Sequence, residues 1–202
     1  MTGPSRGLTI VLGAMATGPS ILVTAFEPFG IVRGSVPGLR GNRSRDILGL
    51  LRADYDFVDQ LTFEVLPVNA AACTRLEDRL SEGPSGVLLM GEDLLSSIRL
   101  EPRAYDPDYQ IGPLRLPGAR TRTSGFATLI APDMKVRGVS SASGIGTYYC
   151  NRAYWDALGW SERMSGRPAV FFHVGPHSNL EWQCSVVRAA LVRMRRAVPV
   201  PA

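Results

Sequence analysis

Short runs of apolar residues recur along the chain, and their spacing predicts a series of buried β-strands. Residues 20–25, 86–91 and 169–175 are continuous apolar runs that end at Gly or Pro or beside a polar turn, a pattern typical of strands buried on both faces. Residues 61–68 and 97–101 alternate between apolar and polar side chains, as a strand with one buried face does. A further strand is predicted at residues 135–143.

Between these strands the apolar positions repeat with a helical period. Asn42 and Ser44 offer N-cap oxygens ahead of a helix whose apolar stripe begins at Ile47. Asn69 offers the same ahead of the next helix. From Pro102 to Pro132 no clear period is present. Four helices are predicted, at residues 45–53, 70–81, 147–158 and 181–196.

Strands that alternate with helices are typical of an α/β fold. We therefore predict a single domain with a mostly parallel, twisted central sheet and helices on both faces. A chain of 202 residues suits one such domain, which we expect over residues 21–196. Residues 1–20 are read as an N-terminal extension that could lie upstream of a true start at Met15, and residues 197–202 as a tail.

Composition and charge narrow the function classes. The formal net charge is +4, but the basic residues are scattered along the chain, so binding to nucleic acid is not expected. No apolar stretch reaches the roughly 18 residues that a membrane span needs, and residues 8–16 make only a weak imitation of a signal peptide. Three widely spaced cysteines form neither a disulfide framework nor a zinc ribbon and fit a reducing compartment. We therefore predict a cytoplasmic protein that does not bind a membrane.

Cofactor and metal sites lack their usual motifs. The chain has no G-x-G-x-x-G after a strand and no phosphate-binding loop, so we expect no cofactor. His173 and His177 are spaced as H-x-x-x-H, but Gly175 and Pro176 between them oppose the helix that would let both bind one metal ion. No metal is expected.

Two residues are candidates for nucleophilic chemistry. Cys150 lies near the start of a predicted helix, where the helix dipole and free N–H groups would lower the pKa of its thiol. His173 lies near the end of the strongest predicted strand, where sites of parallel α/β folds form. Taken alone, a cysteine or histidine in such a place is more often a packing residue.

Several short segments together carry a resemblance that no single one would establish. In chain order they are ILVTAFEPFG (21–30), NRS (42–44), LPV (66–68), SIRLE (97–101), GTYYCN (146–151) and FFHV (171–174). This series resembles the type I pyroglutamyl peptidases (pyrrolidone-carboxylate peptidases), cysteine peptidases that remove an N-terminal pyroglutamyl residue. The resemblance implies that the sheet is of the phosphorylase/hydrolase-like kind. It also implies Cys150 as nucleophile, His173 as base and Glu101 as the third catalytic residue. It further implies Phe26 and Phe29 as aromatic walls of the substrate pocket, and it allows for a homo-oligomer, which relatives often form.

The resemblance is weakest in the loop before Glu101. The family has a neutral, glycine-rich segment there that helps to recognise the lactam ring, whereas this chain has GEDLLSS at 91–97. Glu92, a predicted substrate-binding residue, and Asp93 would bring negative charge to it. Three hypotheses follow. The protein removes an N-terminal pyroglutamyl residue, it applies the same chemistry to another lactam, amide or ester by hydrolysis, acyl transfer or cyclisation, or it is a catalytically silent binding protein.

Overall fold

The structure is a computed structural model, and it describes residues 20–28, 41–54, 60–93, 97–111, 114–141 and 145–197. Its centre is a six-stranded sheet in the order β2-β1-β3-β10-β4-β9. The strands β2, β1, β3 and β10 are mutually parallel, whereas β4 is antiparallel to β10, and β9 runs parallel to β4. Their bounds are β1 Ile21–Phe26, β2 Leu61–Leu66, β3 Gly86–Glu92, β4 Ile98–Glu101, β9 Ser140–Ser141 and β10 Ala169–Val174. The predicted mostly parallel sheet is confirmed.

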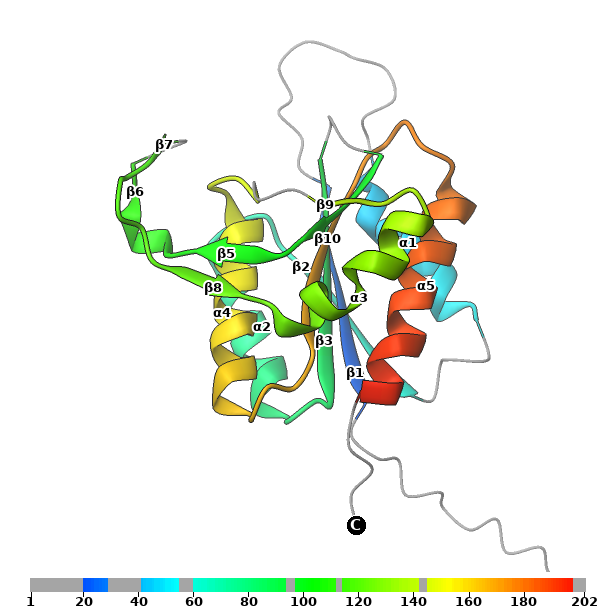
Figure 1. Cartoon of the computed structure of the whole chain (residues 1–202), viewed down its shortest axis with the longest axis horizontal. Helices are drawn as coiled ribbons and strands as arrows, with labels where there is room; N and C mark the ends of the chain where they lie inside the picture. Colours follow the sequence, from blue (N-terminus) through cyan, green and yellow to red (C-terminus); the bar gives the residue numbers. More distant parts are fainter. Residues whose placement is uncertain are drawn as a thin grey trace, which may run out of the picture.

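Helices cover both faces of this sheet (Figure 1). On one face lie α1 (Arg43–Arg52), α3 (Gly125–Val136) and α5 (Leu180–Ala197), and on the other lie α2 (Ala71–Ser81) and α4 (Tyr149–Arg163). Each face has its own cluster of buried apolar side chains. Because both faces are covered, the central strands are fully buried, which explains their continuous apolar runs.

The NRS segment at 42–44 ties the first helix to the end of β1. Asn42 caps α1, its side-chain oxygen accepting from the backbone N–H of Ser44 at 3.0 Å. The hydroxyl of Ser44 in turn accepts from the backbone N–H of Phe26 at 3.2 Å, and the amide of Asn42 donates to the carbonyl of Glu27 at 3.0 Å. These short polar side chains satisfy the backbone groups where the strand ends and the helix begins.

Residues 102–132 contain short elements that the sequence pattern did not predict. The pairs β5 (Arg103–Tyr105) with β8 (Thr121–Thr123) and β6 (Gln110–Ile111) with β7 (Leu114–Arg115) form two small antiparallel ribbons, with a 3-10 turn, η2 (Pro107–Tyr109), between them. The buried amide of Asn151 fastens β5 to α4, since it donates to the carbonyl of Tyr105 at 2.8 Å and accepts from the N–H of the same residue at 2.9 Å.

The predicted strand at 135–143 is largely wrong. Lys135 and Val136 are the last residues of α3, and in this segment the described strand is β9, which covers only Ser140 and Ser141. The helix α3 lies in the region that showed no period, where Pro132 stands inside it and Leu129 and Val136 are exposed. Among the described helices, none combines the length and apolar character that crossing a bilayer requires.

Candidate active site

The alternation of side chains along three strands brings a set of polar residues to one face of the sheet. In β3, β4 and β10 every second side chain packs in the cluster shared with α1, α3 and α5, while the intervening ones of β3 and β10 pack against α2 and α4. The face toward α4 therefore receives Gly91 and Asp93 from β3 and the residue after it, Arg99 and Glu101 from β4, and His173 from β10.

Cys150 is the second residue of α4, the helix that packs on this face of the sheet. Its sulfur lies against Gly91, so closely that a Cβ at position 91 would stand 2.8 Å from Sγ and 2.9 Å from the ring of Phe171. Gly91 is in register with His173 on the neighbouring strand, and neighbouring strands lie about 4.8 Å apart. The glycine thus makes room for the thiol beside the histidine strand.

His173 and Glu101 form a short, buried hydrogen bond. Nδ1 of His173 lies 2.7 Å from Oε1 of Glu101, whose residue is completely buried. The guanidinium of Arg99 donates from Nε to the same oxygen at 2.6 Å, and its Nη2 lies 3.2 Å from Nδ1 of His173. Because Nδ1 has one in-plane position, it cannot both donate to Glu101 and accept from Arg99. We assign the Nδ1 proton to the shorter, charge-assisted contact with Glu101, so that Nε2 is the ring nitrogen available to the thiol.

A second carboxylate extends this chain of contacts. Asp93 pairs with Nη1 of Arg99 at 2.9 Å, and both side chains are only slightly exposed, at 18% and 17%. The backbone N–H of Asp93 donates to the carbonyl of Val174 at 3.0 Å. Arg99 therefore stands between two carboxylates, and with a neutral His173 the four side chains carry one negative charge in excess.

The thiol of Cys150 is harder to ionise than its place on the helix suggested. Burial raises its pKa to about 12, and the carboxylates of Glu101 and Asp93 act in the same direction, whereas the backbone N–H of Cys150 itself opposes them. The prediction of a lowered pKa is therefore wrong. Burial and the two nearby negative charges destabilise the thiolate more than the dipole and N–H groups at the start of the helix stabilise it.

The three predicted substrate-binding residues have different surroundings. Phe26 is 2% exposed and packs in the core cluster against which Cys150 also packs. Phe29 lies outside the described residues. Glu92 is turned away from the thiol, because its carboxylate accepts from the backbone N–H of Arg43 at 2.6 Å on the α1 face. Burial raises the pKa of the Glu92 carboxyl. Within the segment 91–97, Asp93 is the carboxylate that acts on the Cys150 thiol, in addition to Glu101, and raises its pKa.

The other cysteines and the second histidine lie apart from these contacts. Cys184 is buried in the α5 side of the core, Cys73 is partly buried in α2, and neither forms a disulfide. His177 is exposed in the turn after β10. Within the described ranges, no group of three or more His, Cys, Asp or Glu side chains is arranged to hold a metal ion.

Two neighbours of the histidine were not singled out from the sequence. Arg99 stands two residues before Glu101 in an alternating segment, which by itself indicates a shared face with Glu101. Gly91 gave no such signal, since its importance depends on a contact with Cys150, 59 positions further along the chain. The described contacts are a histidine hydrogen-bonded to a buried carboxylate and a thiol against the glycine of the neighbouring strand, which are residue types that nucleophilic acyl transfer uses.

We compared the chain with known proteins to see which of them share its fold. No protein-family model and no curated protein sequence matches the chain. Among solved structures, pyrrolidone carboxyl peptidase from Thermus thermophilus is 29% identical, with a TM-score of 0.65 over 85% of this chain and 98% of that one. A variant of the enzyme from Pyrococcus furiosus is 23% identical, with a TM-score of 0.67 over 89% and 100%.

The pyrrolidone carboxyl peptidase from Thermococcus litoralis has the same fold, with 21% identity and a TM-score of 0.65 over 92% of this chain and all of that one. At 21% and 23% identity, the enzymes from Pyrococcus and Thermococcus show similarity in fold alone. The Thermus enzyme, at 29% identity, is also similar in sequence. The resemblance predicted from the short motifs is confirmed. In its fold the chain is similar to the pyrrolidone carboxyl peptidases over most of its length.

Proposed function

We propose that the protein is a cysteine peptidase that removes an N-terminal pyroglutamyl residue from peptides through a thioester on Cys150. The observation that carries this proposal is the 2.7 Å contact of His173 with the buried Glu101, on the sheet face where Cys150 Sγ lies against Gly91. The similarity to the Thermus enzyme supports the substrate. Nothing in this proposal calls for a metal or cofactor.

The raised thiol pKa favours a first step in which proton transfer accompanies the attack. With a pKa of about 12, only on the order of one thiol in 10⁵ is ionised at pH 7. Sγ therefore loses its proton to Nε2 of His173 as it attacks the acyl carbon, and no standing thiolate and imidazolium pair is needed. Glu101 keeps Nδ1 protonated and stabilises the imidazolium that forms.

The remaining steps return the enzyme to its starting state. The imidazolium gives its proton to the departing amine as the C–N bond breaks, and the acyl group stays on Sγ as a thioester. A water molecule then gives a proton to Nε2 and attacks the same carbon, the C–S bond breaks, and the proton returns to the thiol. Because Cys150 is the second residue of α4, the proposal assigns stabilisation of the oxyanion to backbone N–H groups of the first helical turn.

Arg99 and Asp93 are positioning residues, which act on the reaction through Glu101. Arg99 holds Oε1 of Glu101 at 2.6 Å, so that the carboxylate presents one fixed oxygen to His173. Asp93 holds Arg99 at 2.9 Å. The same pair brings charge to the side of the site where the resemblance leads us to expect neutral backbone.

That charge favours a second candidate, in which the same residues act on a different lactam, amide or ester. Asp93 is partly exposed beside the thiol, and an extra negative charge there would disfavour acidic substrates and favour neutral or cationic ones. Under this candidate the thioester on Cys150 forms as before, and water, an amine or an internal nucleophile resolves it.

The test compares wild-type protein, Cys150→Ala and the matched control Cys73→Ser on a panel of chromogenic pyroglutamyl amides and other acyl donors. We expect the wild type and Cys73→Ser to hydrolyse pyroglutamyl amides and Cys150→Ala to be inactive, with an acyl adduct on Cys150 visible by intact mass. A wild type inert on every pyroglutamyl amide but acylated by another donor would select the second candidate. Absence of any adduct from any donor would point to a silent binding protein.

A further inference from the structure

The outer edge of the sheet, far from Cys150 in the strand order, is built differently from the rest. In the part of the chain that the structure describes, β2 pairs with β1 and has no strand on its other side. Between β2 and the strand of His173 lie β1 and β3, a spacing of about 14 Å across the sheet. An open groove of about 660 Å³ runs along this edge.

The backbone of β2 presents hydrogen-bonding groups to this groove at alternate residues. The carbonyl of Leu66 accepts from Glu27, on the β1 side. The carbonyls of Phe63 and Val65 point the other way, since side chains from the two flanking helices reach them, Arg52 at 3.4 Å and Arg75 at 3.5 Å. These distances are near the limit of a hydrogen bond, so the two carbonyls are easily released. By the alternation of a strand, the N–H groups of the same two residues also face outward.

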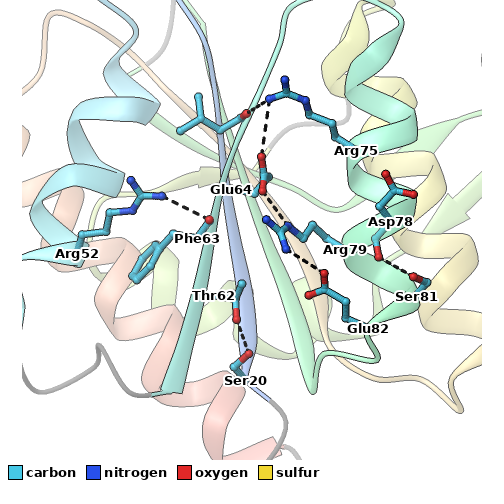
Figure 2. Close-up of polar contacts among 11 residues, drawn as sticks. Ser20, Arg52, Thr62, Phe63, Glu64, Arg75, Asp78, Arg79, Ser81 and Glu82 are labelled. Carbon is cyan, nitrogen blue, oxygen red and sulfur yellow. Dashed lines mark hydrogen bonds and ion pairs between the residues drawn. The ribbon is translucent and has the colours of Figure 1, made fainter.

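Arginines flank the edge on both faces of the sheet. Figure 2 shows Arg52 on the α1 side, over the ring of Phe63 at 5.4 Å, and Arg75 and Arg79 on the α2 side, around Glu64. The charged residues that line the groove are Arg45, Arg52, Arg75, Arg79, Glu27 and Glu64. Positive charge is therefore in excess, and Glu82 at the rim, which pairs with Arg79, removes only part of it.

We infer that this edge is a docking site for an extended, acidic segment of a partner protein, which adds to the sheet as a strand beside β2. A strand places successive side chains on opposite faces, so an acidic segment would present carboxylates to Arg45 and Arg52 on one face and to Arg75 and Arg79 on the other. Its backbone would pair with Phe63 and Val65, in the manner of β-strand addition.

A second copy of the chain is a poorer occupant of this edge. Pairing β2 with the β2 of another copy would bring the arginines of one molecule against those of the other, and like charges opposite each other in a sheet are destabilising. The arginines therefore select an acidic partner and also discourage self-pairing, a known hazard of free edges. This inference does not depend on the proposed function.

The test measures binding of a fluorescent, end-blocked peptide of repeated Glu-Glu-Val-Val, which as a strand presents carboxylates on both faces, to the full chain by polarisation. We expect saturable binding that weakens as salt is added, no binding of the matching Lys and Val peptide, and loss of binding when alternate amides of the Glu peptide are N-methylated. The double variant Arg52→Glu/Arg75→Glu should weaken binding at least about tenfold, while the charge reversal Arg137→Glu, at the exposed end of α3, should not change it.

Two further variants separate this site from the catalytic proposal and from self-association. Val65→Pro removes an outward N–H but no bond to β1, so it should abolish binding and leave the sedimentation of the protein unchanged. Cys150→Ala should bind the peptide like wild type. The inference is overturned if the Glu peptide does not bind, if N-methylation has no effect, or if Val65→Pro dissociates a dimer. In the first case the arginines only shield the edge.

Discussion

The protein contains two clusters of arginine and carboxylate that look alike in composition and differ in surroundings. At the carboxyl end of the central strands, Arg99 pairs with Asp93 and with Glu101, which is completely buried. At the edge of the sheet, Arg79 pairs with Glu64 and Glu82, and the arginine side chain is 39% exposed. The contact distances are similar, between 2.6 and 2.9 Å in both clusters.

The difference between them lies in what the charges act on. The arginines of the edge cluster are 39% and 54% exposed, although Glu64 between them is only 15% exposed. Pairs with exposed arginines are screened by water and salt and contribute little to stability. In the buried cluster the charges act on a neighbouring thiol, and burial with the two carboxylates raises the pKa of Cys150 to about 12. For the same pair of residue types we therefore propose recognition at one place and chemistry at the other.

Glu101→Gln should have the largest effect, because it removes charge from the buried cluster while keeping the side-chain shape. An amide in place of the carboxylate no longer stabilises the imidazolium or fixes its tautomer, so we expect kcat on the best acyl substrate to fall about 10²-fold to 10⁴-fold. Loss of a buried charged hydrogen bond should also lower the free energy of unfolding by about 1–3 kcal/mol. Steady-state kinetics and denaturant titration measure both, and near wild-type kcat would remove Glu101 from the mechanism.

Gly91→Ala tests how tightly the buried cluster is packed. A methyl group there would meet Sγ of Cys150 at 2.8 Å and the Phe171 ring at 2.9 Å, so the thiol has to move from its place beside His173. We expect a loss of about 1–3 kcal/mol in unfolding free energy together with a fall in kcat. The matched control is Gly49→Ala in α1, where nothing lies within 4 Å of the added Cβ. It should be neutral or slightly stabilising, and equal behaviour of the two variants would contradict the tight contact.

The sequence predicted the buried central strands better than the helix in residues 102–136. The strands at 21–26, 86–92 and 169–174 are buried on both faces, so their apolar runs are strong local signals. The helix Gly125–Val136 gave no such signal, because Pro132 lies inside it and its exposed positions include Leu129 and Val136. Local pattern fails where tertiary packing, and not an amphipathic stripe, holds a helix in place.

The site shows the same division. The order of short motifs pointed to His173 and Glu101, and the structure brings them to 2.7 Å. Glu92 was predicted to bind substrate, yet its carboxylate bonds the N–H of Arg43 at the start of α1, whereas Asp93 pairs with Arg99. The thiol pKa could not be predicted from the position in the helix, since it depends on burial and on carboxylates from two other strands.

Asp93→Asn and Arg99→Met should change the reactivity of Cys150 in opposite directions. Asp93→Asn removes one of the two carboxylates that raise the thiol pKa, so alkylation at a fixed pH should become about twofold to tenfold faster. Arg99→Met leaves both carboxylates without their shared cation and should slow alkylation. Iodoacetamide rates for the Cys150 peptide, followed by mass spectrometry across pH, measure this, and the wild-type rate should keep rising well above pH 9. The same shift in both variants would show general loosening of the site.

Glu64→Gln makes the same chemical change as Glu101→Gln, but at the edge of the sheet, where Glu64 is 15% exposed and its partner Arg79 is 39% exposed, and it should have the smallest effect. Arg79 keeps its partner Glu82 at 2.9 Å, and exposed ion pairs contribute about 0–1 kcal/mol, so the free energy of unfolding should change by no more than that and kcat should not change. Because Arg75 and Arg79 lose a shared carboxylate, the acidic peptide should bind somewhat more tightly along β2. Denaturant titration and polarisation test both parts. A destabilisation as large as that of Glu101→Gln would mean that the edge cluster is structural, and the contrast between the two regions would then fail.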